Sequence, residues 1–114
     1  MICDFADIVV VPFPFTDQPI TKRRPAMVFS STEFNSETGQ TVLAMITTAA
    51  AGNWPNDVEI VDTRSAGLDH QSFVRWKMFT LPNQLVLRKV GTLSEGDMNG
   101  LRRSTRSSFP ACTT

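Results

Sequence analysis

The sequence predicts a small, mainly β domain that ends in one helix. The chain has 114 residues, which suits a single domain with a modest core of its own. Short apolar runs bounded by turn-forming residues recur about every ten residues, a spacing typical of an antiparallel sheet or barrel. Only the segment that begins near Ser94 carries a clear helix start signal.

Six segments have the composition of β-strands. They are Ile8–Val11, Ala26–Phe29, Thr41–Thr47, Asp57–Asp62, Phe73–Met78 and Leu85–Leu93. In the fourth segment, Val58 and Ile60 are spaced to face the same side of a sheet. The connections 16–24, 31–40 and 49–56 are polar, and we expect loops there, with room for a helical turn in the last.

The predicted helix begins after Ser94. A serine with Asp97 three residues later is a helix-capping pattern, and acidic side chains are favoured in a first turn. Met98 and Leu101 form an apolar pair at helical spacing, but the spacing stops after Leu101. We therefore expect a folded domain over 1–101 and a frayed or altered tail over 102–114.

Composition narrows the classes of function. The net charge is zero, yet residues 1–62 hold three basic and eight acidic side chains, whereas 63–114 hold eight basic and three acidic ones. Such a balance disfavours indiscriminate coating of nucleic acid but permits a local basic groove. The acidic start and the lack of a long apolar run predict a cytoplasmic protein without a membrane partner. The chain has one histidine and no Cys-x-x-Cys, which argues against a zinc site, and we expect no metal or other cofactor. A disulfide between Cys3 and Cys112 is not expected.

The most informative segment runs from Asp7 to Ser31. A strand ends in Pro-Phe-Pro-Phe, a polar loop carries Asp17, and Lys-Arg-Arg precedes Pro25. A residue before proline is pushed toward extended backbone, so Arg24 is expected on a fixed stem at the mouth of the sheet. A guanidinium there can fork onto a phosphate, or it can pair with a carboxylate on the rim.

These pieces, in this order, resemble the PemK/MazF family of toxins. Further matches are Ala44-Met-Ile-Thr-Thr48, Ser72-Phe-Val-Arg75, Phe79-Thr-Leu81 and the segment from Val90-Gly-Thr-Leu to Ser94, so the resemblance covers residues 5 to 101. It implies an SH3-like antiparallel β-barrel of the CcdB/PemK/MazF type with a C-terminal helix, usually a homodimer.

The resemblance also implies a function. The chain would be the toxin of a type II toxin–antitoxin system, a metal-independent endoribonuclease that cleaves single-stranded mRNA. The ribose 2′-OH would attack the adjacent phosphate, leaving a 2′,3′-cyclic phosphate and a 5′-OH. Implied partners are single-stranded RNA, a cognate antitoxin, a second copy of the chain and, together with the antitoxin, promoter DNA.

The resemblance assigns roles residue by residue. Arg24 would stabilise the phosphorane or protonate the leaving oxygen, Thr47 would donate to a phosphate oxygen, and Arg75 would supply a second guanidinium. The residues expected to bind RNA are Lys22, Arg23, Thr48, Trp76 and Lys77. Trp54 and Trp76 each have two interpretations, stacking on an unpaired base or packing in the core or a dimer interface.

The chain departs from the family pattern at several positions. Ala6 replaces the opening glycine, and Lys77 stands where one branch has an aspartate. The general base is therefore open between Asp17, which could instead cap a turn, and His70, which could be a plain surface residue. An alternative function follows, a weak or inactive module of this fold that binds antitoxin or DNA or acts on gyrase.

Overall fold

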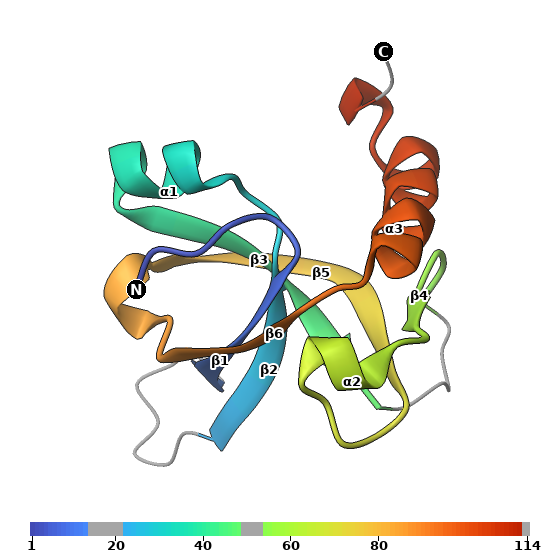
Figure 1. The fold of residues 1–114 in the computed structure, drawn as a ribbon. Helices are drawn as coiled ribbons and strands as arrows, with labels where there is room; N and C mark the ends of the chain where they lie inside the picture. Colours follow the sequence, from blue (N-terminus) through green and yellow to red (C-terminus); the bar gives the residue numbers. More distant parts are fainter. Residues whose placement is uncertain (14–21, 49–53, 113–114) are drawn as a thin grey trace.

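The computed structural model describes residues 1–13, 22–48 and 54–112, and its centre is a strongly curled antiparallel sheet (Figure 1). The strands are β1 (Asp7–Phe13), β2 (Lys22–Val28), β3 (Gln40–Thr47), β4 (Val58–Ile60), β5 (Ser72–Pro82) and β6 (Arg88–Thr92). The helices are α1 (Thr32–Thr38), α2 (Thr63–Ala66) and α3 (Glu95–Ser108), with 3₁₀ turns at Asn83–Leu85 and Pro110–Cys112. The described residues thus confirm a mainly β fold, and each strand overlaps a predicted segment.

The strand order is β4-β5-β3-β2-β1-β6, with every pairing antiparallel. The first strand therefore lies inside the sheet, between β2 and β6. No helix in the described parts of the chain is long and apolar enough to cross a membrane.

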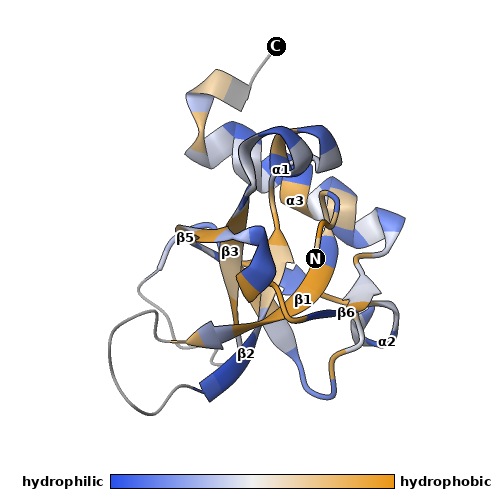
Figure 2. Cartoon of the chain, turned by 90° about the vertical axis from the view of Figure 1, so that its left-hand side faces the viewer, coloured by the Kyte–Doolittle hydropathy of each residue, from blue (hydrophilic) through white to orange (hydrophobic). Residues whose placement is uncertain are grey.

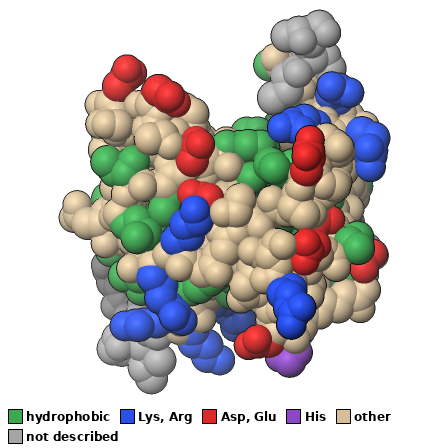
Figure 3. Space-filling model, in the orientation of Figure 1, with side chains coloured by type: hydrophobic (Ala, Val, Ile, Leu, Met, Phe, Trp, Pro, Cys, Tyr) green, Lys and Arg blue, Asp and Glu red, His purple; other side chains and the backbone are tan. Residues whose placement is uncertain are grey.

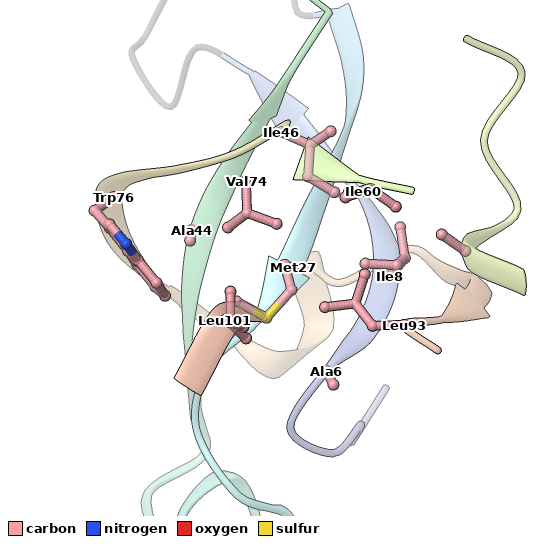
Figure 4. Close-up of a cluster of buried hydrophobic side chains, with 11 residues drawn as sticks. Ala6, Ile8, Met27, Ala44, Ile46, Ile60, Val74, Trp76, Leu93 and Leu101 are labelled. Carbon is pink, nitrogen blue, oxygen red and sulfur yellow. The ribbon is translucent and has the colours of Figure 1, made fainter. Parts of the chain in front are cut away.

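Both faces of the sheet bury apolar side chains, in two clusters. The first cluster consists of Ala6, Ile8, Met27, Ala44, Ile46, Ile60, Ala66, Val74, Trp76, Leu93 and Leu101 (Figure 4). The second consists of Cys3, Val9, Val11, Ala26, Val28, Leu43, Leu81 and Val86. Successive residues of a strand point to opposite faces, so Ile8 joins the first cluster while Val9 joins the second. Figure 2 shows apolar colouring along β1, whereas the first residues of β2 are hydrophilic.

Helix α1 occupies part of the 31–40 segment that we expected to be a loop. Its seven residues lack an apolar stripe, so the sequence carries no helical periodicity there. The ends hold it instead: the Phe34 N–H donates to Ser31 Oγ at 3.1 Å, and Gly39 closes the helix at φ 71°. The fully buried Asn35 anchors it, because its Nδ2 donates to the Cys3 carbonyl at 2.9 Å.

Helix α3 begins as predicted but continues past Leu101. The Asp97 N–H donates to Ser94 Oγ at 3.2 Å, and the helix ends at Ser108 rather than fraying after residue 101. A hydrogen bond and an aromatic contact hold its second half, and neither requires apolar residues at helical spacing in the sequence. Trp76 Nε1 donates to Ser104 Oγ at 2.7 Å, and the Phe109 ring packs edge-on against Trp76 at 5.3 Å.

Replacing Gly91 with alanine is expected to destabilise the fold. A Cβ at Gly91 would lie 2.4 Å from the Ser65 carbonyl oxygen and the Ala66 carbonyl carbon, where α2 packs on β6. Because backbone must move to admit it, we expect a loss of about 1–3 kcal/mol in the free energy of unfolding, measured by urea denaturation. Gly96→Ala is the control, since the nearest atom to its Cβ is 4.0 Å away in an exposed helical turn. Equal urea midpoints for the two variants would contradict the close packing of α2 on β6.

Candidate functional site

A pocket of about 380 Å³ opens beside β2, β3 and β5. Its lining residues are Phe13, Arg24, Pro25, Met45, Ile46, Thr47, Thr48, Trp54, Arg75 and Lys77. Five of the nine site residues singled out from the sequence are therefore brought together: Arg24, Thr47, Thr48, Arg75 and Lys77. They are far apart in the chain, and the pairing of three strands makes them neighbours.

Strand geometry places the two arginines. Arg24 lies in extended backbone on β2 opposite Val11, as expected for a residue before proline. On β5, Arg75 lies opposite Met45 of β3, whereas the neighbouring Ala44 of β3 pairs with Met78. The register shift leaves two extra residues on β5 and re-aims the strand at the pocket, as β-bulges near functional sites often do.

The Arg75 guanidinium is held from two sides. Its Nη2 donates to Asp57 Oδ2 at 2.9 Å, and its Nε lies 3.3 Å from both carboxylate oxygens. Its Cζ also lies 5.9 Å from the centre of the Trp54 ring, within cation–π range. The hydrogen bonds to Asp57 raise the pKa of Arg75, so the guanidinium stays charged. Nη1 makes no hydrogen bond to the described residues and can reach a ligand.

Arg24 has a different environment. It is exposed, and the two ion pairs in the described parts of the chain are Arg75–Asp57 and Lys89–Asp7. Within those parts, the alternative in which Arg24 pairs with a rim carboxylate is therefore not observed. Among the described residues, no carboxylate occupies the guanidinium of Arg24.

The remaining site residues lie elsewhere. Trp76 is only 9% exposed and belongs to the first cluster, so the expectation that it stacks on RNA is corrected in favour of the core alternative. Lys22 and Arg23 are exposed on β2 but do not line the pocket. Asp17 lies outside the described residues. His70 is exposed and lines a neighbouring pocket of about 280 Å³ that shares Pro25 and Thr48 with the first.

Trp54, left open between stacking and packing, is 40% exposed and lines the pocket, so it is the tryptophan available for stacking. One feature was missed from the sequence. Asp57, which holds Arg75, was assigned only to a strand. No sequence signal links Asp57 to a partner 18 residues away on another strand.

Basic side chains form a band across the sheet. Lys22, Arg23 and Arg24 on β2 and Arg88 and Lys89 on β6 flank β1, where Pro12 pairs with Arg23 and Val10 with Arg88. All five are exposed. Figure 3 shows Lys and Arg side chains gathered at the lower left of this face and again at its upper right, whereas acidic ones lie over α1 at the top left and along the right-hand side. Because side chains alternate between faces along a strand, Lys22 and Arg24 share a face while Arg23 points to the other, and Lys89 pairs with Asp7 at 3.1 Å.

The chemistry of the pocket is that of an anion site. Two guanidinium groups, one ammonium and two hydroxyls line it, and no acidic side chain does so in the described parts of the chain. Those parts also hold no group of three His, Cys, Asp or Glu side chains arranged for a metal ion. Such donors bind a phosphate and stabilise charge that develops on it.

Comparisons with known proteins agree with this geometry. Residues 4–109 match the family model described as PemK-like, MazF-like toxin of type II toxin–antitoxin system. No match was found among the curated proteins.

Solved structures resemble the fold along nearly its whole length. A MazE–MazF crystal structure from Deinococcus radiodurans has a TM-score of 0.74 at 20% identity and covers 96% of this chain and 98% of that one. The Mycobacterium tuberculosis toxin MazF-mt6 gives 0.71 at 22%, with 91% and 96% covered. An endoribonuclease in complex with its cognate antitoxin from Mycobacterial species gives 0.73 at 15%, with 96% and 94% covered. The predicted fold class is thereby confirmed.

Proposed function

The chain belongs to the PemK-like, MazF-like toxin family of type II toxin–antitoxin systems, and we propose that it is a metal-independent endoribonuclease acting in the cytoplasm. In the proposed reaction, the ribose 2′-oxygen forms a bond to the adjacent phosphorus while the bond to the 5′-oxygen breaks. The 2′-OH loses its proton to a base and the leaving oxygen gains one, which gives a 2′,3′-cyclic phosphate and a 5′-OH. DNA lacks the nucleophile and is not cut.

One observation carries this proposal: Arg24, Thr47 and Arg75, from three strands, line a single pocket. The phosphorane gains negative charge in the transition state, and fixed donors that meet this charge lower the barrier. Arg24 stabilises the phosphorane or protonates the leaving oxygen, Thr47 binds a phosphate oxygen, and Nη1 of Arg75 supplies the second cation.

The candidates for the general base stay Asp17 and His70. His70 lines the neighbouring pocket, which shares Thr48 and Pro25 with the first. A weak base is tolerable where electrostatic stabilisation supplies most of the rate.

RNA binding extends beyond the reacting phosphate. Trp54 offers an aromatic surface for an unpaired base, and Lys77 and Thr48 bind the backbone within the pocket. Lys22 and Arg23 continue the path of positive charge along β2. Further partners in this proposal are a second copy of the chain, a cognate antitoxin whose disordered segment covers the groove and, with the antitoxin, promoter DNA.

A second candidate is a binding module of this fold without nuclease activity, directed at antitoxin, DNA or gyrase. The observation that favours it is the lack of an acidic side chain among the described residues of the pocket, where Lys77 stands instead. The two functions differ in what happens to RNA.

The test is incubation of the purified chain with a pool of single-stranded RNA of random sequence in EDTA. We expect cleavage at the same rate as without EDTA, with 5′ ends that accept phosphate from a kinase directly. The 3′ ends should join to a 5′-phosphorylated adaptor only after the cyclic phosphate has been opened and the remaining phosphate removed. A matched DNA pool should stay intact. Intact RNA from a folded chain would refute the nuclease proposal and favour the binding module.

A further inference from the structure

A chain of hydrogen bonds connects helix α3 to the guanidinium of Arg75. Trp76 Nε1 donates to Ser104 Oγ at 2.7 Å, and Ser104 Oγ donates to the Asn56 carbonyl oxygen at 2.8 Å. The next residue, Asp57, binds Arg75. Helix, turn and pocket are thus joined by direct contacts.

The direction of these bonds is fixed. A serine hydroxyl has one hydrogen, and the indole N–H of Trp76 occupies a lone pair of Ser104, so the hydroxyl hydrogen points to Asn56. The indole belongs to the buried first cluster, so the donor of the first hydrogen bond in this series is held rigidly. The core therefore sets the orientation of Ser104.

Asn56 needs such support. Its φ of 64° lies in the left-handed region, which asparagine tolerates better than most residues. Its side chain is tied as well, because Nδ2 donates to Ser108 Oγ at 2.9 Å. Two serines of α3, four residues apart, hold the main chain and the side chain of one strained residue.

On one side, the turn that contains Asn56 and Asp57 is not supported by packed side chains of the described residues. A pocket of about 450 Å³ lies between β4 and α3, and Asn56, Asp57 and Ser104 all line it. No described side chain fills this space behind the turn, so hydrogen bonds to Asn56, the residue before Asp57, support the turn on this side.

We propose that Asn56, Asp57 and Ser104 are positioning residues that hold Arg75 at the pocket, so that helix α3 sets the catalytic geometry. The inference rests on the proposed function. A free arginine samples many rotamers, whereas a guanidinium bound through Nε and Nη2 presents Nη1 in one direction. Preorganisation of this kind appears in the rate of the chemical step.

The experiment compares Asp57→Asn, Ser104→Ala and Ser104→Thr with Ser107→Ala as the matched control. Ser107 lines the same pocket, but its hydroxyl bonds only within α3, to the Arg103 carbonyl. We expect about 10- to 100-fold lower kcat with little change in KM for Asp57→Asn and Ser104→Ala. Ser104→Thr should restore much of the rate, and Ser107→Ala should match the parent chain.

A double-mutant cycle separates positioning from a general loss of structure. If Asp57 acts through Arg75, Asp57→Asn should add almost nothing in an Arg75→Ala background. Full additivity, or a folded Asp57→Asn with unchanged kcat, would overturn the proposal.

NMR of the Arg75 Nε–H gives a readout that does not need activity. The signal should shift and lose protection from exchange in Ser104→Ala and keep both in Ser107→Ala. If the parent chain leaves RNA intact, the nuclease proposal fails, and an Arg75 signal indifferent to Ser104 would also remove the positioning role.

Discussion

Replacing Arg24 with alanine is expected to lower the rate of RNA cleavage by about 10²–10³-fold, because a donor to the developing phosphorane charge is lost. The side chain is exposed at the pocket and makes no ion pair with the described residues, so its removal should leave the fold intact. Single-turnover cleavage of a defined RNA measures the effect, and urea denaturation checks the fold.

Two variants sharpen this test. Arg23→Ala removes the neighbouring exposed charge outside the pocket, so it should raise KM modestly and weaken the salt dependence of binding. Arg24→Lys keeps the charge without the planar fork and should recover only part of the rate. Equal losses for Arg23→Ala and Arg24→Ala would reduce Arg24 to one more contact in the basic band.

Replacing Trp76 with alanine is expected to cost about 3–5 kcal/mol of unfolding free energy, the range for truncating a buried aromatic side chain. Its ring lies edge-on to Phe29 at 5.5 Å and to Phe109 at 5.3 Å, and its N–H holds Ser104. The cavity would open where α3 joins the sheet. The shift of the urea midpoint measures the loss.

Trp54→Ala is the matched control for Trp76. Trp54 is 40% exposed and packs beside the Arg75 guanidinium, so the variant should keep the parent stability and bind single-stranded RNA more weakly. The stability of Trp76→Phe should lie between those of the parent chain and Trp76→Ala, because phenylalanine keeps much of the ring packing but loses the hydrogen bond to Ser104. A Trp76→Ala chain as stable as the parent would contradict the role of the aromatic cluster.

The sequence predicted what depends on alternation and order. Ile8, Met27 and Val74 lie in short apolar runs bounded by turn residues, which predict strands, and the sheet buries apolar side chains on both faces. Arg24, Thr47 and Arg75 could be singled out because the motifs that carry them follow one another as in a known family. Their meeting at one pocket required the pairing of β2, β3 and β5.

What escaped prediction rests on polar and long-range contacts. Helix α1 is held by Ser31, Asn35 and Gly39, and none of these produces periodicity. The end of α3 depends on Ser104 meeting Trp76, a contact that only the folded sheet creates. Asp57 meets Arg75 because β4 pairs with β5, and no pattern in the sequence predicts that pairing or the bulge that follows Arg75 on β5.

The position of β1 has a consequence for how the protein is made. This strand leaves the ribosome before the other strands of the described sheet, and its pairing with β6, in which Gly91 lies opposite Ile8, cannot form until β6 has been made. Until then, a row of unpaired backbone groups beside apolar side chains can recruit a second nascent chain. Arg24, Thr47 and Arg75 all precede β6, so translation delivers the pocket residues before it delivers the strand that completes the sheet. Synthesis halted before residue 88 should yield an aggregating fragment rather than a partly active one.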